Sequence, residues 1–195
     1  MTEREIRGIL ARCTVGIAGC GGLGSNCAVA LARIGIGRLI LVDFDRIEES
    51  NLNRQYYFRD QLGMPKVEAL QANIGRIDSR VVVSTHFLKL TPENIPVLFK
   101  GCDVVVEAFD HADQKLMIIE TILEHLPGMS IVSGSGMAGW GGNELIRTEQ
   151  FGNLVVCGDH LTEVSEEMPP LAPRVGIVSG MQANAVLEIL INKSK

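Results

Sequence analysis

The chain has 195 residues, of which 46% are hydrophobic and 21% charged, and its formal net charge is −5. This composition excludes a disordered protein, and the acidic balance excludes a generally basic surface for nucleic acid. Its longest apolar stretches are interrupted by Gly, Asp or Arg short of the ~20 residues that a membrane span needs, and the charged start lacks the apolar core of a secretory signal. We therefore expect one cytoplasmic domain over residues 1–195, with no membrane and no nucleic acid as partners.

Strand-like and helix-like hydrophobic periods alternate along the chain, which is typical of an α/β fold. The expected strands are 14–18, 38–43, 81–85, 103–108 and 130–133. The expected helices are 22–34, 65–77, 92–99 and 112–126. We expect a Rossmann-like, mostly parallel sheet with helices on both faces. The carboxyl ends of its strands should gather polar residues along one edge.

The character of the chain changes after Gly134. A glycine-rich connection covers residues 134–143, and short strand-like pieces follow at 144–147 and 153–157. We expect these two pieces to form an antiparallel C-terminal extension of the sheet. Residues 158–173 are acidic and then proline-rich, which favours an irregular loop, and 175–191 should form a buried closing helix.

A cluster of glycines separates the first expected strand from the first expected helix. Gly19, Gly21 and Gly24 satisfy the pattern G-x-G-x-x-G, in which backbone amides and a helix N-terminus approach a phosphate. Gly22, Leu23 and Ser25 complete this candidate phosphate loop. The second strand ends at Asp43, followed by Asp45, where a carboxylate that binds ribose is expected.

Arg54 and Lys66 distinguish this site from a generic dinucleotide fold. A guanidinium binds phosphate as a bidentate fork and a lysine as a point charge, and the pair suits a triphosphate better than the pyrophosphate of NAD. Asn51, Asn53 and Gln55 add neutral donors and acceptors beside them. The simpler alternative is that Arg54 is a solvated loop charge and Lys66 an ordinary surface residue.

Asp110 follows the fourth strand, where its carboxylate could hold Mg²⁺ against ATP phosphates. The alternative is an N-cap for the following helix, a role that Asp113 could equally fill. The five cysteines form no C-x-x-C pair, so we expect no zinc and regard most of them, including Cys20, as small buried residues.

Five motifs occur in an order that resembles the ThiF/MoeB/HesA family, the bacterial relatives of ubiquitin-activating enzymes. They are Gly19-x-Gly21-Gly22-Leu23-Gly24-Ser25, Asp43-Phe44-Asp45, residues 50–55 (SNLNRQ), residues 63–66 (GMPK) and Asp110. Residues 106–115, 156–159 and 169–190 are most similar to the short ThiF branch, the adenylyltransferases of the sulfur carrier ThiS.

The resemblance implies a homodimeric enzyme that uses ATP and Mg²⁺ to adenylate the C-terminal Gly-Gly carboxylate of a ubiquitin-like sulfur carrier, for thiamine thiazole biosynthesis. It implies that Asp43 binds the ribose, Arg54 and Lys66 the phosphates, and Asp110 the magnesium. The glycine-rich segment 134–143 could admit a thin Gly-Gly tail, or could be a plain turn.

Two features of the family have no clear counterpart in this chain. Relatives place an N-terminal arginine across a dimer interface, and Arg4, Arg7 and Arg12 are equal candidates for that role. Some relatives also have a cysteine in a crossover loop that bonds to the carrier or its sulfur. Cys157 is the candidate by position, although a buried strand residue is the simpler interpretation.

Three other functions compete with this interpretation. An NAD-dependent oxidoreductase fits the glycine loop and Asp43, but leaves Arg54 and Lys66 without a role. A non-catalytic scaffold for a ubiquitin-like protein would not need Asp110. A dehydratase of the same family, which activates a carboxylate on tRNA, fits the motifs but suits the acidic chain less well.

Overall fold

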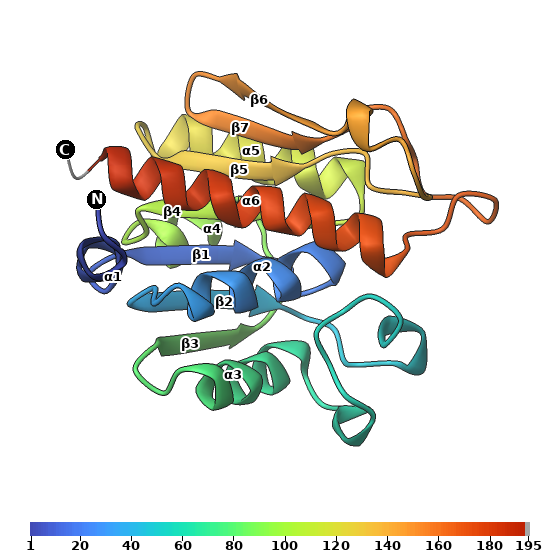
Figure 1. The fold of residues 1–195 in the computed structure, drawn as a ribbon, viewed down its shortest axis with the longest axis horizontal. Coiled ribbons are helices and arrows are strands. Elements are labelled where there is room, and N and C mark those ends of the chain that lie inside the picture. The colour runs from blue at the N-terminus through green and yellow to red at the C-terminus, as the bar shows by residue number, and fades with distance from the viewer. Residues whose placement is uncertain (194–195) are drawn as a thin grey trace.

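The computed structural model describes residues 1–193, which form a seven-stranded sheet covered by helices on both faces (Figure 1). The strands are β1 (Thr14–Ala18), β2 (Arg38–Asp43), β3 (Val82–Phe87), β4 (Val104–Glu107), β5 (Ser130–Gly134), β6 (Arg147–Phe151) and β7 (Leu154–Gly158). Their spatial order is β3-β2-β1-β4-β5-β7-β6, and every pair except β6–β7 is parallel. The expected Rossmann-like α/β fold is confirmed.

The helices divide into two layers because the strands bury apolar residues on both faces. The α-helices are α1 (Glu3–Leu10), α2 (Gly22–Arg33), α3 (Lys66–Ile77), α4 (Ile95–Phe99), α5 (Ala112–His125) and α6 (Ala172–Asn192). Helices α2, α3 and α6 pack on one face, and α4 and α5 pack on the other (Figure 1). Ile17 of β1 belongs to the first core and its neighbour Ala18 to the second, as the alternation of a strand requires.

Helix α1 was not among the expected helices. Thr2 caps it, because the Thr2 hydroxyl accepts a hydrogen bond from the Glu5 N–H (3.3 Å) and the Glu5 carboxylate accepts one from the Thr2 N–H (2.6 Å). This reciprocal pair is a capping box, and the sequence T-x-x-E is its signature. The motif was therefore present in the sequence.

The expected strand at 144–147 is wrong. A 3₁₀ turn, η3 (Asn143–Leu145), occupies its first two residues, and β6 begins only at Arg147. The polar residues of β6 suit an exposed edge strand, and the strand pairs antiparallel with β7 through a tight turn at Gly152. β7 itself lies parallel to β5, so only β6 is an antiparallel extension.

The remaining boundaries differ from expectation by a few residues. The fourth helix begins at Ile95 rather than at 92, because the Asn94 side chain accepts a hydrogen bond from the Thr91 N–H (2.9 Å) in a turn before it. Residues 159–171 form the expected irregular loop, in which Pro170 makes an isolated β-bridge with Gly139.

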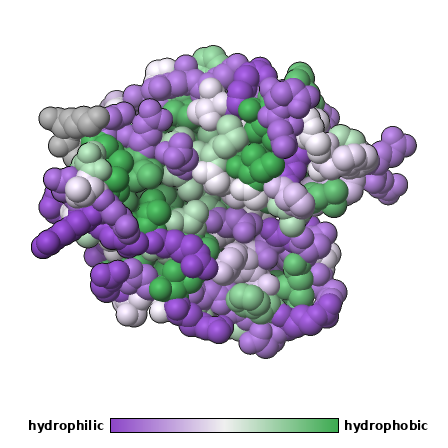
Figure 2. All heavy atoms as spheres, viewed as in Figure 1, coloured by the Kyte–Doolittle hydropathy of each residue, from purple (hydrophilic) through white to green (hydrophobic). Residues whose placement is uncertain are grey.

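Helix α6 is long and apolar enough to cross a membrane by length and composition alone, which the interrupted apolar stretches of the sequence had not led us to expect. It packs against α2 and against β4, β5 and β7, and the core helix of a globular protein passes the same test. Part of its outer side stays exposed, including Ile177. Hydrophobic atoms, drawn in green, show on the face of the molecule where α6 lies (Figure 2).

Candidate functional site

A cavity of about 780 Å³ lies beyond the carboxyl ends of the parallel strands. Its volume falls within the roughly 300–1,000 Å³ of small-molecule sites. The strand order reverses between β1 and β4, and open α/β sheets bind ligands at such a switch point. Its lining includes these candidate residues from the sequence: Gly19, Gly21, Gly22, Leu23, Asp43, Asp45, Arg54, Gln55, Lys66 and Asp110.

The glycine loop brings the N-terminus of α2 to the cavity. Gly21 is the N-cap of this helix, which has no side-chain cap and no acidic residue in its first turn. Its first backbone N–H groups are therefore available to an anion. A Cβ atom on Gly24 would lie 1.8 Å from the carbonyl oxygen of Gly19, so Gly24 permits the loop to fold tightly onto the helix but lies outside the cavity lining.

Ser25 also lies outside the lining and is completely buried. Its hydroxyl donates to the carbonyl of Gly21 (2.6 Å) and accepts from the N–H of Tyr56 (3.0 Å). The Tyr57 hydroxyl adds a second tie by donating to the carbonyl of Cys20 (2.7 Å). The structure thus places Ser25 as a link between the glycine loop and the segment that contains Arg54.

Asp43 faces the cavity from the end of β2 and is almost fully buried. One carboxylate oxygen accepts the N–H of Cys20 (2.6 Å) and the other accepts the N–H of Asp45 (2.7 Å). Burial raises the pKa of Asp43, against the opposing effects of Lys66 and of these two hydrogen bonds. Each oxygen retains capacity to accept a further hydrogen bond, as two ribose hydroxyls would require.

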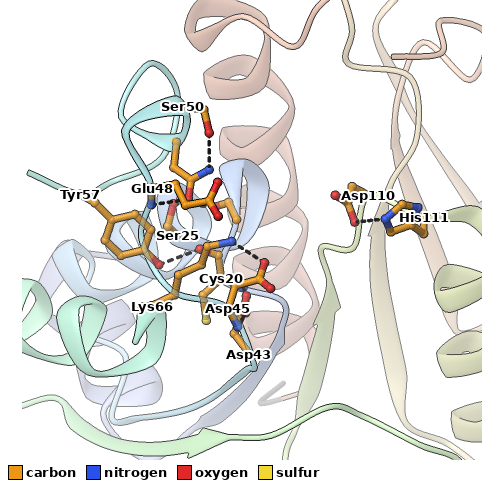
Figure 3. Close-up of polar contacts among 12 residues, drawn as sticks. Cys20, Ser25, Asp43, Asp45, Glu48, Ser50, Tyr57, Lys66, Asp110 and His111 are labelled. Atoms are coloured by element: carbon orange, nitrogen blue, oxygen red, sulfur yellow. Dashed lines mark hydrogen bonds and ion pairs between the residues drawn. The ribbon is translucent and has the colours of Figure 1, made fainter. Parts of the chain in front are cut away.

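Lys66 lies at the start of α3 with its ammonium 2.7 Å from the carboxylate of Asp45 (Figure 3). The lysine side chain is only 7% exposed and the aspartate side chain 49%. The alternative that Lys66 is an ordinary surface residue is therefore wrong.

Arg54 lines the cavity beside Gln55. Its Nη1 donates to the carbonyl of Ser50 (3.1 Å) and to the side chain of Asn53 (2.8 Å). Asn53 and Asn51 lie outside the lining, and the Asn51 side chain accepts from the N–H of Glu48 (3.1 Å) within a 3₁₀ turn, η1 (Glu49–Asn51). The structure places both asparagines in the framework around Arg54.

Asp110 follows β4 on the cavity wall across from Lys66, with its carboxylate 3.7 Å from His111 (Figure 3). The N-cap of α5 is His111 without a side-chain cap, so neither Asp110 nor Asp113 fills the capping role. In residues 1–193 no group of three or more His, Cys, Asp or Glu is arranged for a metal. A single carboxylate still fits Mg²⁺, which is held by one or two carboxylates together with substrate phosphates.

Sequence reasoning missed a buried polar cluster beneath Asp110. Glu107 is completely buried, and Lys115 donates to both of its carboxylate oxygens (3.0 Å each). The carboxylate also accepts from the Ser133 hydroxyl (2.5 Å) and from the N–H of Phe109 (2.7 Å). The sequence signal was Glu107 itself, an acidic residue at the end of an otherwise apolar strand. A carboxylate buried in such a strand needs a cation as its partner.

The cysteines next to the site are buried. Cys20 and Cys157 are inaccessible, and burial raises the pKa of both thiols. A protonated, inaccessible thiol is a poor nucleophile. The interpretation of both as small buried residues is confirmed in this structure.

The N-terminal arginines do not line the cavity. Helix α1 precedes β1 and lies at the amino end of that strand, away from the carboxyl ends where the cavity opens (Figure 1). Arg7 pairs with Glu3 (2.9 Å). Within one copy of the chain, Arg4, Arg7 and Arg12 therefore have no part in the site.

A family model described as the ThiF family matches residues 5–195. The chain is 32% identical over 194 residues to a protein of Dictyostelium discoideum named adenylyltransferase and sulfurtransferase MOCS3, a match covering 95% of this chain and 45% of that protein. The protein of the same name from Bos taurus is 37% identical over 129 residues, covering 66% of this chain and 28% of the relative. The chain thus spans less than half the length of these relatives.

Solved structures share the fold. The crystal structure of E. coli tRNA N6-threonylcarbamoyladenosine dehydratase, TcdA, in complex with ATP superposes with a TM-score of 0.88 at 21% identity, covering 97% of this chain and 90% of that one. E. coli MccB with succinimide superposes with a TM-score of 0.73 at 23% identity, covering 95% of this chain and 58% of that one.

Proposed function

The chain belongs to the ThiF family, and from this premise we propose that it is an ATP-dependent adenylyltransferase that activates the C-terminal Gly-Gly carboxylate of a ubiquitin-like, ThiS-like sulfur carrier for thiamine thiazole biosynthesis. One observation carries the proposal. The free N-terminus of α2, the Asp43 carboxylate and the cations of Arg54 and Lys66 all face one cavity. A triphosphate nucleotide needs such a combination, because it presents a ribose and several negative charges together.

The reaction needs positioning and charge neutralisation rather than a protein nucleophile. A carboxylate oxygen of the carrier attacks the α-phosphorus of ATP, the bond from that phosphorus to the bridging oxygen breaks, and pyrophosphate carries away the negative charge. Arg54 and Lys66 neutralise charge that develops on the phosphate oxygens. Asp110 would hold Mg²⁺, which supplies further positive charge to the phosphates.

The proposed partners are a Gly-Gly-ended carrier protein and a second copy of the chain. The relatives named adenylyltransferase and sulfurtransferase support the first, since they share about a third of their aligned residues with this chain. The exposed apolar side of α6, with Ile177, is compatible with the second. A cytoplasmic location stays a prediction.

The NAD-dependent alternative fits the cavity less well. Arg54 and Lys66 line the same cavity as Asp43, and this positive charge exceeds what a pyrophosphate needs. Among residues 1–193, His111 is the one histidine in the cavity lining, and it is exposed beside Asp110.

ATP–pyrophosphate exchange tests the proposal. We expect exchange with a ThiS-like carrier that ends in Gly-Gly, and none with the same carrier lacking its last two residues. Exchange driven by N6-threonylcarbamoyladenosine tRNA and not by any carrier would replace the carrier with a tRNA substrate. Absence of exchange together with tight NAD binding would overturn the proposal.

A further inference from the structure

A buried ion pair joins the loop after β7 to the start of α6. Arg174 donates from Nη2 to the carboxylate of Asp159, and their side chains are 5% and 1% exposed. The other end of the same guanidinium donates from Nη1 to the carbonyl of Gly141 (2.8 Å) and weakly to that of Trp140 (3.4 Å). One arginine therefore holds two loops that are distant in sequence.

Asp159 organises its own loop as well. Its carboxylate accepts the N–H groups of Leu161 (2.8 Å) and Thr162 (2.9 Å) and the hydroxyl of Thr162 (2.9 Å). On the other side, the N–H of Asp159 donates to the carbonyl of Gly136 (3.1 Å). A Cβ atom on Gly136 would lie 1.9 Å from Oδ1 of Asp159, so the two segments touch closely.

Both of these segments line the cavity, although the ion pair itself does not. Ser135, Gly136 and Met137 contribute from one segment, and Thr162, Glu163 and Val164 from the other. They follow β5 and β7, whereas Asp43 is the last residue of β2, which lies on the opposite side of β1 and β4. The cavity thus has a nucleotide end at Asp43 and a second end walled by these two segments.

We propose that Asp159 and Arg174 are positioning residues that fix the two walls of the second end, where the carboxyl terminus of the acyl substrate lies beside the nucleotide. This inference rests on the proposed adenylyltransferase function. Replacing a buried ion pair by apolar residues often leaves stability unchanged, so its presence calls for a reason other than stability. Here the Arg174 guanidinium donates hydrogen bonds to the Asp159 carboxylate and the Gly141 carbonyl at the same time, which an apolar residue cannot do.

Three adenosine ligands can be used to measure binding at the two ends of the cavity separately. AMP and adenosine 5′-sulfamate occupy the nucleotide end alone. A sulfamoyl-adenosine that carries a glycyl-glycyl acyl group mimics the acyl-adenylate and extends into the second end. Their dissociation constants by calorimetry would be compared for the wild type, Asp159→Asn and Arg174→Lys. Arg80→Gln is the control, because it removes an exposed ion pair with Asp78 far from the cavity.

We expect both variants to bind the acyl sulfamate about tenfold or more weakly, as for the loss of a hydrogen bond to a charged group, and AMP within about twofold of the wild type. Hydrogen exchange should accelerate at the amides of Leu161 and Thr162, which donate to Asp159. Thr162→Val removes one hydroxyl donor to Asp159 without breaking the ion pair. It keeps the test decisive if the charge variants do not fold, and it should weaken acyl sulfamate binding while AMP binding is unchanged.

Two contrary results have different meanings. Equal acyl sulfamate affinity in the wild type and all folded variants overturns the positioning role and leaves the adenylyltransferase proposal standing. A wild type that binds the acyl sulfamate no more tightly than adenosine 5′-sulfamate contradicts the proposed function, and this inference falls with it.

Discussion

The ammonium of Lys66 lies 2.7 Å from the carboxylate of Asp45, so the most deeply buried cation of the cavity is held by an acid that follows β2. The backbone supports the same junction, because the N–H of Lys66 donates to the carbonyl of Asp45 (3.0 Å). A phosphate that enters the cavity would compete with the Asp45 carboxylate for the Lys66 ammonium. Before a nucleotide binds, the ion pair with Asp45 holds the Lys66 side chain in the cavity lining.

Replacing Lys66 by Met should lower the rate of ATP–pyrophosphate exchange by roughly 10²-fold or more, as the loss of a charge that stabilises the transition state does. Asp45→Asn should have a smaller effect, because it removes the partner and not the cation. Steady-state exchange with a Gly-Gly-ended carrier measures both. A Lys66→Met enzyme as fast as the wild type would remove the lysine from the mechanism.

Arg54→Ala should also reduce exchange by roughly 10²-fold, because the guanidinium lines the cavity and can neutralise phosphate charge there. The matched control is Arg59→Ala, since Arg59 pairs with Glu49 on the surface at 2.8 Å and lies outside the cavity lining. Thermal unfolding would verify that both variants fold. Equal activity of the two variants would show that Arg54 is a framework residue.

Much of this fold could be predicted from the sequence because its signals are local. The run from Val15 through the glycines predicts a strand, a tight loop and a helix, and β1 and α2 occupy those places. The strand expected at 144–147 was misplaced because the residues of β6 (RTEQF) are mostly polar and lack the apolar pattern of the other strands. Helix α1 carries two local signals that our expectation left out, apolar residues at helical spacing (Ile6, Ile9 and Leu10) and the capping sequence T-x-x-E.

The candidate site was less predictable, because a side chain's direction depends on the packed structure. Ser25 and Asn51 belong to the motifs, yet their side chains bind backbone around the cavity. Glu107 was hidden within an apolar run, and its partner Lys115 becomes visible only once β4 and α5 are packed together. The motifs therefore predict where the site lies, whereas the packed structure determines which side chains face it.

The raised pKa of Asp43 makes nucleoside binding depend on pH. Ribose hydroxyls donate to the ionised carboxylate, so adenosine affinity should fall as the pH is lowered through this raised pKa, beginning above the usual value of 3.8. Calorimetric titration of adenosine from about pH 8 down to about pH 4 measures this, because the window reaches the ordinary carboxyl range and adenosine lacks phosphates that titrate within it. Asp43→Asn should bind weakly with little pH dependence. A flat wild-type profile would place the ribose elsewhere.

The same shift has a consequence for folding, with the sign set by linkage. A carboxyl whose pKa is raised in the folded state favours folding below its unfolded pKa, and that contribution is lost as the pH rises through the folded value. Asp43→Asn should therefore unfold at equal or higher urea concentration than the wild type near neutral pH. Lower stability of this variant at every pH would show that the hydrogen bonds from Cys20 and Asp45 outweigh the burial.

Two glycines of the loop should respond differently to a methyl group. Gly24→Ala places Cβ against the carbonyl of Gly19 at 1.8 Å, so the loop must shift, and we expect a loss of roughly 1–3 kcal/mol in the free energy of unfolding. Gly21→Ala meets nothing closer than the Gln55 side chain at 3.9 Å. It should fold normally and bind ATP more weakly, because its methyl group enters the cavity. Urea unfolding and ATP calorimetry separate the two, and unchanged ATP binding by Gly21→Ala would place the phosphates away from the loop.

The ion pair between Glu107 and Lys115 predicts strong coupling in stability. Lys115→Met leaves a fully buried carboxylate without its cation and should cost roughly 3–5 kcal/mol of unfolding free energy. Glu107→Gln in the same background removes the stranded charge, and the amide can still accept from the N–H of Phe109. The double variant should therefore recover part of the loss, which urea unfolding of all four proteins measures as a double-mutant cycle. Additive losses would show that Glu107 does not depend on Lys115 and that Ser133 and the backbone suffice to hold it.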